Sequence, residues 1–463
     1  CSSDLIFLFI SLIISIAHND SAQFAFLYTT FLITLFGVFP LIFVPAVNNI
    51  SSREGIFIVV FGWILTCFFG ALPFYLFGGE FTFINAIFES VSGFTTTGAS
   101  ILSQVENLPR GILFWRSATH WLGGVGIIMF VLVIIPNIGQ ASLVLFQSEM
   151  SRLAKENFKF RTKTAIQVLL WVYLGLTIAE TILLMVFGMD WFDAICHTFA
   201  TVATGGFSTR NMSIATFNSP YIELVIVVFM FLSGIHFALL FATVMFRRLN
   251  IFRSEVVRYF FLFTFASFIL LFIDLHNANQ FSVFHTIRHS AFQAVSMVTT
   301  TGFASADTNL WPIASQVILI FLSIHCACSG STASGIKSDR FLIFWKTIGL
   351  NLKKIRHPNA IIHVKIDKRI VNEDIINNVL TYIVLYIVVL GISSLLSASC
   401  GVNLLTAFTG SVSTLGNVGP GLGEIGSLGN FNGIPDSVKV IFSGNMLLGR
   451  LEIFLFLSIF SKK

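Results

Sequence analysis

The sequence is poor in charged residues. Asp, Glu, Lys and Arg together make up 11% of its 463 residues, whereas a soluble domain carries roughly 25%. Hydrophobic residues make up 55%, and the mean hydropathy is +0.87. Too few charges remain to cover a water-facing surface, so a soluble globular protein is excluded. The composition predicts a membrane protein, in which a span needs about 20 apolar residues.

Several other features are missing. The six cysteines form no CxxC pair and show no zinc-ligand spacing, so we expect small buried residues rather than a metal site. No nucleophile with a paired base and no metal-ligand cluster is visible in the sequence, which disfavours an enzyme. The net charge of +5 follows from basic loops between apolar segments and calls for no nucleic-acid partner.

One short phrase is present four times, at intervals of roughly 100 residues. Each copy ends a short apolar stretch that is too brief to span a bilayer. Each also lies between two stretches that are long enough to span. The four copies are Thr95–Gly98, Val202–Gly205, Thr299–Gly302 and Ser413–Gly416. A single Thr-Gly turn would mean little, but four copies in the same setting predict four re-entrant pore loops.

This pattern predicts an all-α membrane protein built from four repeats of membrane helix, pore loop and membrane helix. The expected repeats are 51–150, 151–250, 251–352 and 353–463, after an accessory helix pair in 1–50. The expected spans are 56–77, 112–135, 165–187, 221–245, 259–275, one from 311 onwards, 377–397 and 437–460. The expected half-length helices are 83–93, 191–201, 284–297 and 403–411.

Extended backbone at membrane depth must line a water-filled cavity, because its polar groups would otherwise lack partners. Its free carbonyl groups can then replace the hydration shell of a cation, and glycine keeps side chains out of the lumen. None of the four phrases contains Asp or Glu, which argues against a divalent-cation filter and favours potassium. The candidate filter residues are Thr96, Thr97, Gly98, Ala203, Thr204, Gly205, Thr300, Thr301, Gly302, Thr414, Leu415 and Gly416.

The last span of the third repeat is interrupted by a polar stretch from Cys328 to Gly335. It is either a helix kink packed against its neighbours or a mobile constriction below the filter. The candidate gate residues there are Ser329, Gly330, Ser331, Thr332, Gly335 and Lys337. Arg450 lies in the last span, where an unpaired charge is costly. It either pairs with Glu452 or a carbonyl group, or acts as a fixed positive charge beside the conduction path.

Other acidic residues near membrane depth are expected to lie at the interface or to pack against the pore helices. They are Glu89, Glu180, Asp193, Glu223 and Asp274.

Basic residues concentrate in the loops between the predicted repeats. Cytoplasmic loops carry the excess of Lys and Arg, so these loops are predicted to be cytoplasmic and the pore loops to open outward. The residues are Arg152, Lys155, Lys159, Arg161, Lys163, Arg247, Arg248, Arg253, Arg258, Lys353, Lys354, Arg356, Lys365, Lys368, Arg369, Lys462 and Lys463.

Five segments resemble the bacterial Trk/Ktr potassium-transporter superfamily, and in particular the membrane subunit of Trk systems. They are Ser92–Ser100, His120–Gly126, Ala203–Thr209, Gly330–Lys337 and Met446–Glu452. The resemblance implies a pseudo-fourfold arrangement of the repeats around one pore. It implies that potassium binds around Gly98, Gly205, Gly302 and Gly416, and a glycine at position 98 favours potassium over sodium. It also implies that residues 328–337 form an intramembrane gate contacted by Arg450.

The same resemblance implies a homodimer in the bacterial inner membrane, controlled by a cytosolic nucleotide-binding regulatory subunit. No nucleotide-binding unit of the strand–turn–helix kind is recognised in this chain, so the nucleotide would bind to the partner. The leading hypothesis is potassium uptake through the filter. The alternative is an alternating-access, cation-coupled solute symporter, but such proteins usually contain inverted repeats, whereas these repeats all run in the same direction.

Overall fold

The computed structural model describes residues 2–43, 52–134, 162–246 and 250–458. These residues are mostly helical, as predicted. The strands are two short pairs: β1 (His325–Cys326) beside β2 (Ile336–Lys337), which is parallel, and β3 (Lys365–Ile366) beside β4 (Arg369–Ile370), which is antiparallel. Eight of the basic loop residues named above, Arg152, Lys155, Lys159, Arg161, Arg247, Arg248, Lys462 and Lys463, lie outside the described residues, and the predicted orientation stays a prediction.

The helices follow the predicted order. The N-terminal pair is α1 (Ser2–Ala17) and α2 (Gln23–Phe43); the first repeat comprises α3 (Ser52–Phe77), α4 (Phe83–Phe94) and α5 (Arg110–Ile134). The second comprises α8 (Thr162–Val186), α9 (Trp191–Val202), α10 (Pro220–Ser233), α11 (Phe237–Phe246) and α12 (Asn250–Arg253). The third comprises α13 (Glu255–Asn277), α14 (Val283–Val298), α15 (Ile313–Ile324) and α16 (Ser338–Arg356). The fourth comprises α17 (Glu373–Ser399), α18 (Leu404–Gly416), α19 (Asp436–Arg450) and α20 (Ile453–Ser458).

Four of the described helices are long and apolar enough to cross a membrane. They are the first helices of the four repeats, over Glu54–Phe77, Gln167–Val186, Glu255–Asn277 and Glu373–Ser399. Many of their large apolar side chains are exposed; Trp171, for example, is 70% exposed. Such exposed apolar surface is suited to lipid contact.

Each repeat contains one shorter helix with the same start. The residue before each of α4, α9, α14 and α18 accepts a hydrogen bond from a backbone N–H group in the first turn, which is an N-cap. These caps are Thr82, Asp190, Ser282 and Asn403. The C-terminal half of each helix is buried, so the four helices enter the protein end-on, as pore helices do.

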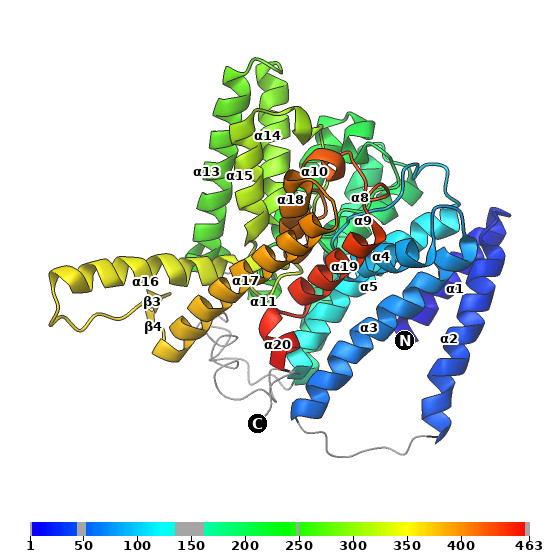
Figure 1. The fold of residues 1–463 in the computed structure, drawn as a ribbon, viewed down its shortest axis with the longest axis horizontal. Helices are drawn as coiled ribbons and strands as arrows, with labels where there is room; N and C mark the ends of the chain where they lie inside the picture. The colour runs from blue at the N-terminus through cyan, green and yellow to red at the C-terminus, as the bar shows by residue number, and fades with distance from the viewer. Residues whose placement is uncertain (1, 44–51, 135–161, 247–249, 459–463) are drawn as a thin grey trace.

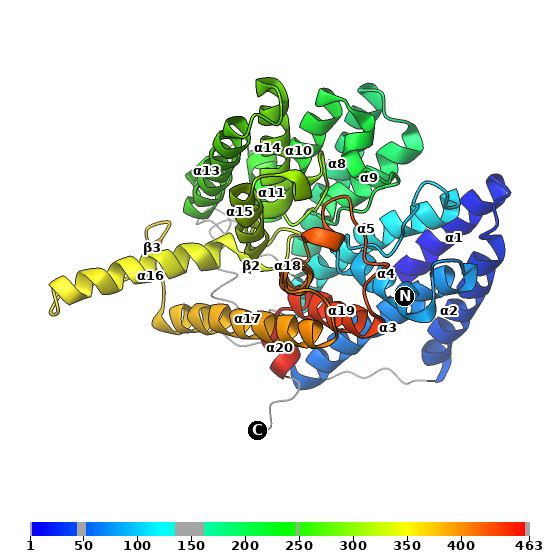
Figure 2. The same cartoon turned by 45° about the horizontal axis from the view of Figure 1, so that its top comes forward.

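The four repeats close into a ring. In Figure 2 the outer helices α3, α8, α13 and α17 follow one another around the molecule in chain order. Each pore helix also packs on the last long segment of the preceding repeat: α9 on α5, α14 on α10, α18 on α15, and α4 on α19. The contact of α4 with α19 joins the first repeat to the fourth. The N-terminal pair lies outside this ring, where α1 packs on α5 and α2 on α3 (Figure 1).

Three details of the predicted helices are wrong. The predicted span 221–245 is broken at Gly234–His236, where α10 and α11 meet at 104°. The fourth half-length helix does not end at residue 411 but continues to Gly416. The last span is interrupted after Arg450, because Glu452 takes a left-handed conformation (φ 59°). The predicted interruption in the third repeat is confirmed, since α15 ends at Ile324 and α16 starts at Ser338.

Candidate ion-conduction site

The four pore helices end in the same backbone geometry. A residue with positive φ follows each helix end: Thr96 (54°), Thr204 (56°), Thr300 (58°) and Asn417 (54°). The N–H group of the next residue donates back to a carbonyl in the last turn, as in a Schellman cap. These bonds run from Thr97 to Ser92, Gly205 to Ala200, Thr301 to Ser296 and Val418 to Ser413, at 2.7–2.9 Å. Caps of this one kind turn the chain at equivalent points in all four repeats.

The next residue in each segment is a glycine with positive φ. These ring glycines are Gly98 (81°), Gly206 (83°), Gly302 (76°) and Gly419 (102°). L-residues with side chains rarely adopt this conformation.

The ring glycines approach one another's repeats too closely for a side chain. A Cβ atom on Gly98 would collide with the carbonyl oxygen of Gly205, and one on Gly206 with that of Thr301. One on Gly302 would collide with the carbonyl oxygen of Val418. A Cβ atom on Gly419 would collide with the carbonyl oxygen of Thr97, which closes the circle. The four segments therefore form one continuous ring of backbone, and only glycine fits at its four joints.

This ring corrects the sequence-based alignment of the phrases in two repeats. Gly205 was predicted as the equivalent of Gly98, but the equivalent residue is Gly206, and Gly205 corresponds to Thr97. In the fourth repeat, Thr414, Leu415 and Gly416 still belong to α18. The ring segment there is Asn417–Gly419, because α18 runs one turn further than predicted.

All four ring glycines line one cavity. Residues that follow them, such as Ser100, Phe207 and Pro420, line it too. The only charged side chains in its described lining are those of Arg116 and Arg210, and no carboxylate is among them. Backbone and hydroxyl oxygens therefore dominate the acceptors at the ring.

Hydroxyl and amide groups hold the ring from behind. The Oγ1 atoms of Thr95 and Thr97 lie 2.8 Å apart, and those of Thr299 and Thr301 lie 2.9 Å apart. The side-chain amide of Asn417 donates to Thr97 Oγ1 at 2.9 Å. This last bond links the fourth repeat to the first, at the joint where the ring closes.

The interruption in the third repeat forms a loop against the inner side of the ring. Strands β1 and β2 pair in parallel and bring the two ends of residues 327–335 together. Within the loop, Gly330 and Gly335 have positive φ (76° and 73°), and Ser331 Oγ donates to the Cys328 carbonyl at 2.6 Å. At its edges, Ser329 donates to Asp339 of α16, and Lys337 is half-buried in β2.

The loop reaches the pore-helix ends of the second and third repeats. Thr332 Oγ1 donates to the Val202 carbonyl at 3.1 Å and accepts from Thr204 Oγ1 at 3.3 Å. The Ser334 N–H group donates to Thr300 Oγ1 at 3.4 Å. A buried polar loop that is bonded to the residues next to the ring can block or open a passage there.

The break between α10 and α11 receives this loop. Cys328 N donates to the Gly234 carbonyl at 3.0 Å, and Phe237 N donates to the Gly330 carbonyl at 3.2 Å. His236 Nδ1 accepts from Ala238 N at 3.1 Å and so caps α11. The broken helix thus regains from the loop the backbone partners that it loses, as buried backbone requires. The hydropathy of residues 221–245 gave no signal for this break.

Arg450, which is 2% exposed, ties the loop to the first repeat. Its Nη1 atom donates to the Thr332 carbonyl at 2.6 Å and to Ser334 Oγ at 3.2 Å. Its Nη2 atom donates to the Gly123 carbonyl of α5 at 2.8 Å. Arg450 therefore pairs with carbonyl groups, and whether its charge also acts on the conduction path stays a prediction. Glu452 pairs with Arg340 instead, at 2.8 Å.

Known proteins resemble this chain in sequence and in fold. The sequence matches the TrkH family, described as "Cation transport protein", over residues 22–463. The chain belongs to the TrkH family. It is 37% identical to the Trk system potassium uptake protein TrkH of Escherichia coli K12, over 97% of this chain and 94% of that protein. It is 34% identical to TrkH of Halomonas elongata, over 89% and 86% of the two chains.

Among solved structures, the potassium transporter TrkH from Vibrio parahaemolyticus has the same fold. The TM-score is 0.88 at 30% identity, and the match covers 99% of this chain and 97% of that one. The predicted resemblance to Trk membrane subunits, the multi-pass membrane character and the transporter class are thereby confirmed.

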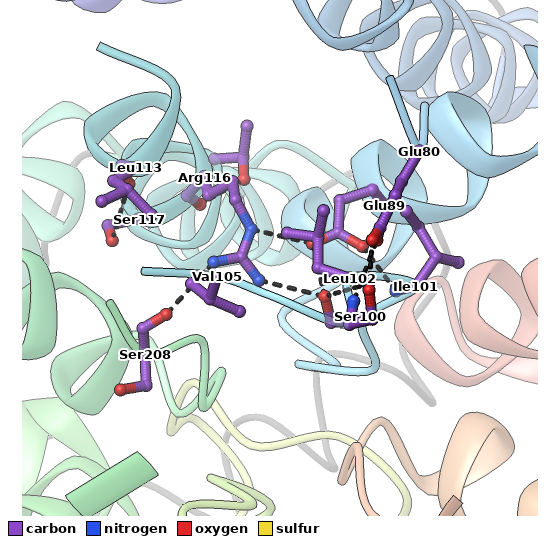
Figure 3. Close-up of polar contacts among 12 residues, drawn as sticks. Glu80, Glu89, Ser100, Ile101, Leu102, Val105, Leu113, Arg116, Ser117 and Ser208 are labelled. Carbon is purple, nitrogen blue, oxygen red and sulfur yellow. Dashed lines mark hydrogen bonds and ion pairs between the residues drawn. The ribbon is translucent and has the colours of Figure 1, made fainter. Parts of the chain in front are cut away.

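In this TrkH-family chain, three ion pairs lie on the pore helices. Glu89 of α4 pairs with Arg116 of α5 at 2.8 Å, with exposed fractions of 0% and 2% (Figure 3). Asp193 of α9 pairs with Arg210 at 2.6 Å, and Arg288 of α14 pairs with Glu223 of α10 at 2.7 Å. The expectation that these acids pack against pore helices is met.

The remaining two acids differ from each other. Asp274 accepts from the N–H and hydroxyl groups of Ser315, at 2.9 and 2.6 Å. Glu180 of α8 is fully buried, and its carboxyl oxygens have no hydrogen-bond partner among the described residues.

Proposed function

We propose that this chain is the potassium-conducting membrane subunit of a Trk-type uptake system in a bacterial inner membrane. The single observation that carries the proposal is the closed ring of backbone around Gly98, Gly206, Gly302 and Gly419. A ring of carbonyl groups without carboxylates suits a monovalent cation that must bind and leave quickly. The names of its relatives, which are potassium uptake proteins, support the same ion.

The filter residues in this proposal are those of the four segments that meet at the ring. Thr96–Gly98 and Thr300–Gly302 keep their sequence-predicted role. Ala203, Thr204 and Gly205 keep theirs with Gly206 added. Asn417, Val418 and Gly419 take the place of Thr414, Leu415 and Gly416, which lie at the end of α18 and support the segment from behind.

The gate in this proposal is the loop from Ser329 to Gly335, with Lys337 at its edge and Arg450 as its latch. The loop bonds to residues beside the ring on one face and to Arg450 on another. Deleting residues 330–335 should therefore raise the basal cation flux. A flux equal to that of the intact protein would favour a passive kink.

The partners follow from the same system. We propose a homodimer whose opening is controlled by a cytosolic nucleotide-binding regulatory subunit of the Trk type. The last turn of α16 carries Lys353, Lys354 and Arg356, and the excess of basic residues predicts that this end is cytoplasmic, where such a subunit would bind.

Flux measurements test the proposal. The purified chain in liposomes should pass potassium and rubidium down a membrane potential, and Gly206→Asp should abolish that flux by placing a side chain in the ring. Gly433→Asp is the matched control, because a Cβ atom there would meet no atom within 4 Å. Solute-dependent, alternating-access kinetics, or full potassium flux in Gly206→Asp, would contradict the filter assignment.

A further inference from the structure

Arg116 connects the first two repeats directly beside the ring. Its Nε atom donates to Glu89 Oε1 at 2.8 Å and its Nη2 atom to Ser100 Oγ at 3.2 Å, both in the first repeat. Its Nη1 atom donates to the Ser208 carbonyl of the second repeat at 3.1 Å. Its guanidinium group also lies over the Phe207 ring, 4.2 Å from the centroid. Figure 3 shows the guanidinium group between Glu89, Ser100 and Ser208.

The two serines occupy equivalent places. Ser100 lies just beyond ring glycine Gly98, and Ser208 lies just beyond Gly206. Glu89 fixes the first of these segments through Ser100 Oγ at 2.9 Å and the Ile101 N–H group at 3.0 Å. The part of the ring between Gly98 and Gly206 is therefore held by the planar guanidinium group of Arg116 and the carboxylate of Glu89.

The other two repeats have no equivalent clamp among the described residues. The positions that correspond to Glu89, counted back from each ring glycine, are His197, Gln293 and Gly410. His197 Nε2 lies 2.9 Å from Ser208 Oγ, so the second segment is held from behind as well. Gln293 is fully buried without a hydrogen-bond partner for its amide, and Gly410 has no side chain to contribute. The third and fourth segments are instead held within their own repeats by hydroxyl groups: Ser296 Oγ donates to the Phe303 carbonyl at 2.7 Å, and Ser413 Oγ donates to the Gly419 carbonyl at 2.6 Å.

The energetics of a buried ion pair indicate that it fixes the positions of its neighbours rather than stabilising the fold. Removing two charges from water costs about as much as their attraction returns, and apolar residues of similar size are often as stable. A guanidinium group with three bonds in a fixed plane does, however, hold its acceptors in one geometry. Discrimination between cations of different size depends on the positions of the coordinating carbonyl groups.

We propose that the Glu89–Arg116 pair sets the distance between the first and second ring segments, and so acts as a specificity-determining positioning pair for the transported cation. The inference rests on the proposed function and deepens it. It assigns the discrimination between potassium and the smaller sodium ion in part to side chains that do not touch the ion. It also makes the filter unequal, because among the described residues only the first and second segments are joined through a charged pair.

The test uses the full-length protein in liposomes and measures potassium and sodium flux in the same preparation. Glu89→Gln keeps the shape but removes the charge, and Arg116→Lys keeps the charge but removes the planar fork. Both should retain potassium flux while the potassium-to-sodium flux ratio falls about tenfold, the effect expected from one lost charge-assisted hydrogen bond. Ser100→Ala removes one contact of the network and should shift the ratio in the same direction by less.

The matched control is the Arg288–Glu223 pair, which also joins a pore helix to a neighbouring helix through a buried carboxylate but bonds to no ring segment in the described contacts. Glu223→Gln and Arg288→Lys should leave the ratio at the wild-type value, whatever they do to thermal stability. A ratio unchanged within twofold in folded Glu89→Gln, Arg116→Lys and Ser100→Ala would overturn the inference. So would an equal shift in the control pair, since that would indicate a general loss of packing. A protein that passes no potassium even when Arg450→Ala has released the loop would overturn the proposed function itself.

Discussion

In the proposed gate, Arg450 holds the loop in a closed position, and its removal should therefore open the pore. The Nη1 atom makes two bonds to the loop, to the Thr332 carbonyl and to Ser334 Oγ. A hydrogen bond to a charged group contributes roughly 1.5 kcal/mol at the low end of measured values, so two contribute about 3 kcal/mol. Because 1.4 kcal/mol is a factor of ten in an equilibrium constant, Arg450→Ala should raise the open population about a hundredfold.

The assay is rubidium flux into potassium-loaded liposomes that contain the purified chain without any partner. Arg450→Lys and Arg450→Gln separate the two physical explanations. If hydrogen bonds close the loop, the flux should rise in both, because neither side chain can reach Thr332, Ser334 and Gly123 together. If the positive charge alone repels cations, Arg450→Lys should behave like the wild type. A basal flux of Arg450→Ala within twofold of the wild type, in a protein that remains monodisperse, would refute the latch.

Three further predictions concern the ring and the loop. Gly419→Ala should lower the potassium-to-sodium flux ratio, because its Cβ atom would collide with the Thr97 carbonyl in the ring. Gly416→Ala, whose Cβ atom would collide with the Ser323 carbonyl behind the ring, should lower stability and leave the ratio unchanged. The reverse pattern would restore the sequence-based alignment. Thr332→Val should raise the basal flux about tenfold, because the variant loses the hydrogen bond to the Val202 carbonyl. An unchanged flux would show that Thr332 is not part of the gate. His236→Ala should lower the free energy of unfolding by about 1 kcal/mol, because α11 loses its cap. The effect is measured as a fall in Tm. A Tm equal to that of the wild type would contradict the capping role.

The sequence alone predicted the repeated architecture because each repeat carries its own evidence. A long apolar span, a short apolar stretch and a Thr-Gly phrase recur four times, and chance does not repeat such an order. The interruption in the third repeat was predictable for a similar reason. Cys328–Gly335 is too polar to continue a helix in hydrocarbon, so the backbone must leave the helix there.

The alignment within the ring was not predictable from composition. In the second repeat, Gly205 and Gly206 are adjacent, and either could occupy the joint. In the fourth, glycines at 416, 419, 421 and 423 offer several choices. The residue at which each pore helix ends decides which glycine lies at the joint of the ring, and α18 ends later than its apolar stretch suggests.

The break between α10 and α11 was missed because it depends on contacts distant in sequence. Residues 221–245 are apolar throughout and read as one span. The break is stable because Gly234 and Phe237 exchange backbone hydrogen bonds with Cys328 and Gly330, almost a hundred residues later. The hydrophobic pattern of residues 221–245 carries no information about hydrogen bonds to such a distant segment.

The most direct measurement is a crystal structure of this chain with rubidium in place of potassium, using the anomalous signal of the ion. The account predicts anomalous peaks on the axis of the ring, within coordination distance of the carbonyl groups of Thr97, Gly205, Thr301 and Val418. Peaks centred on Thr414–Gly416 instead, or no peak inside the ring at saturating rubidium, would contradict it.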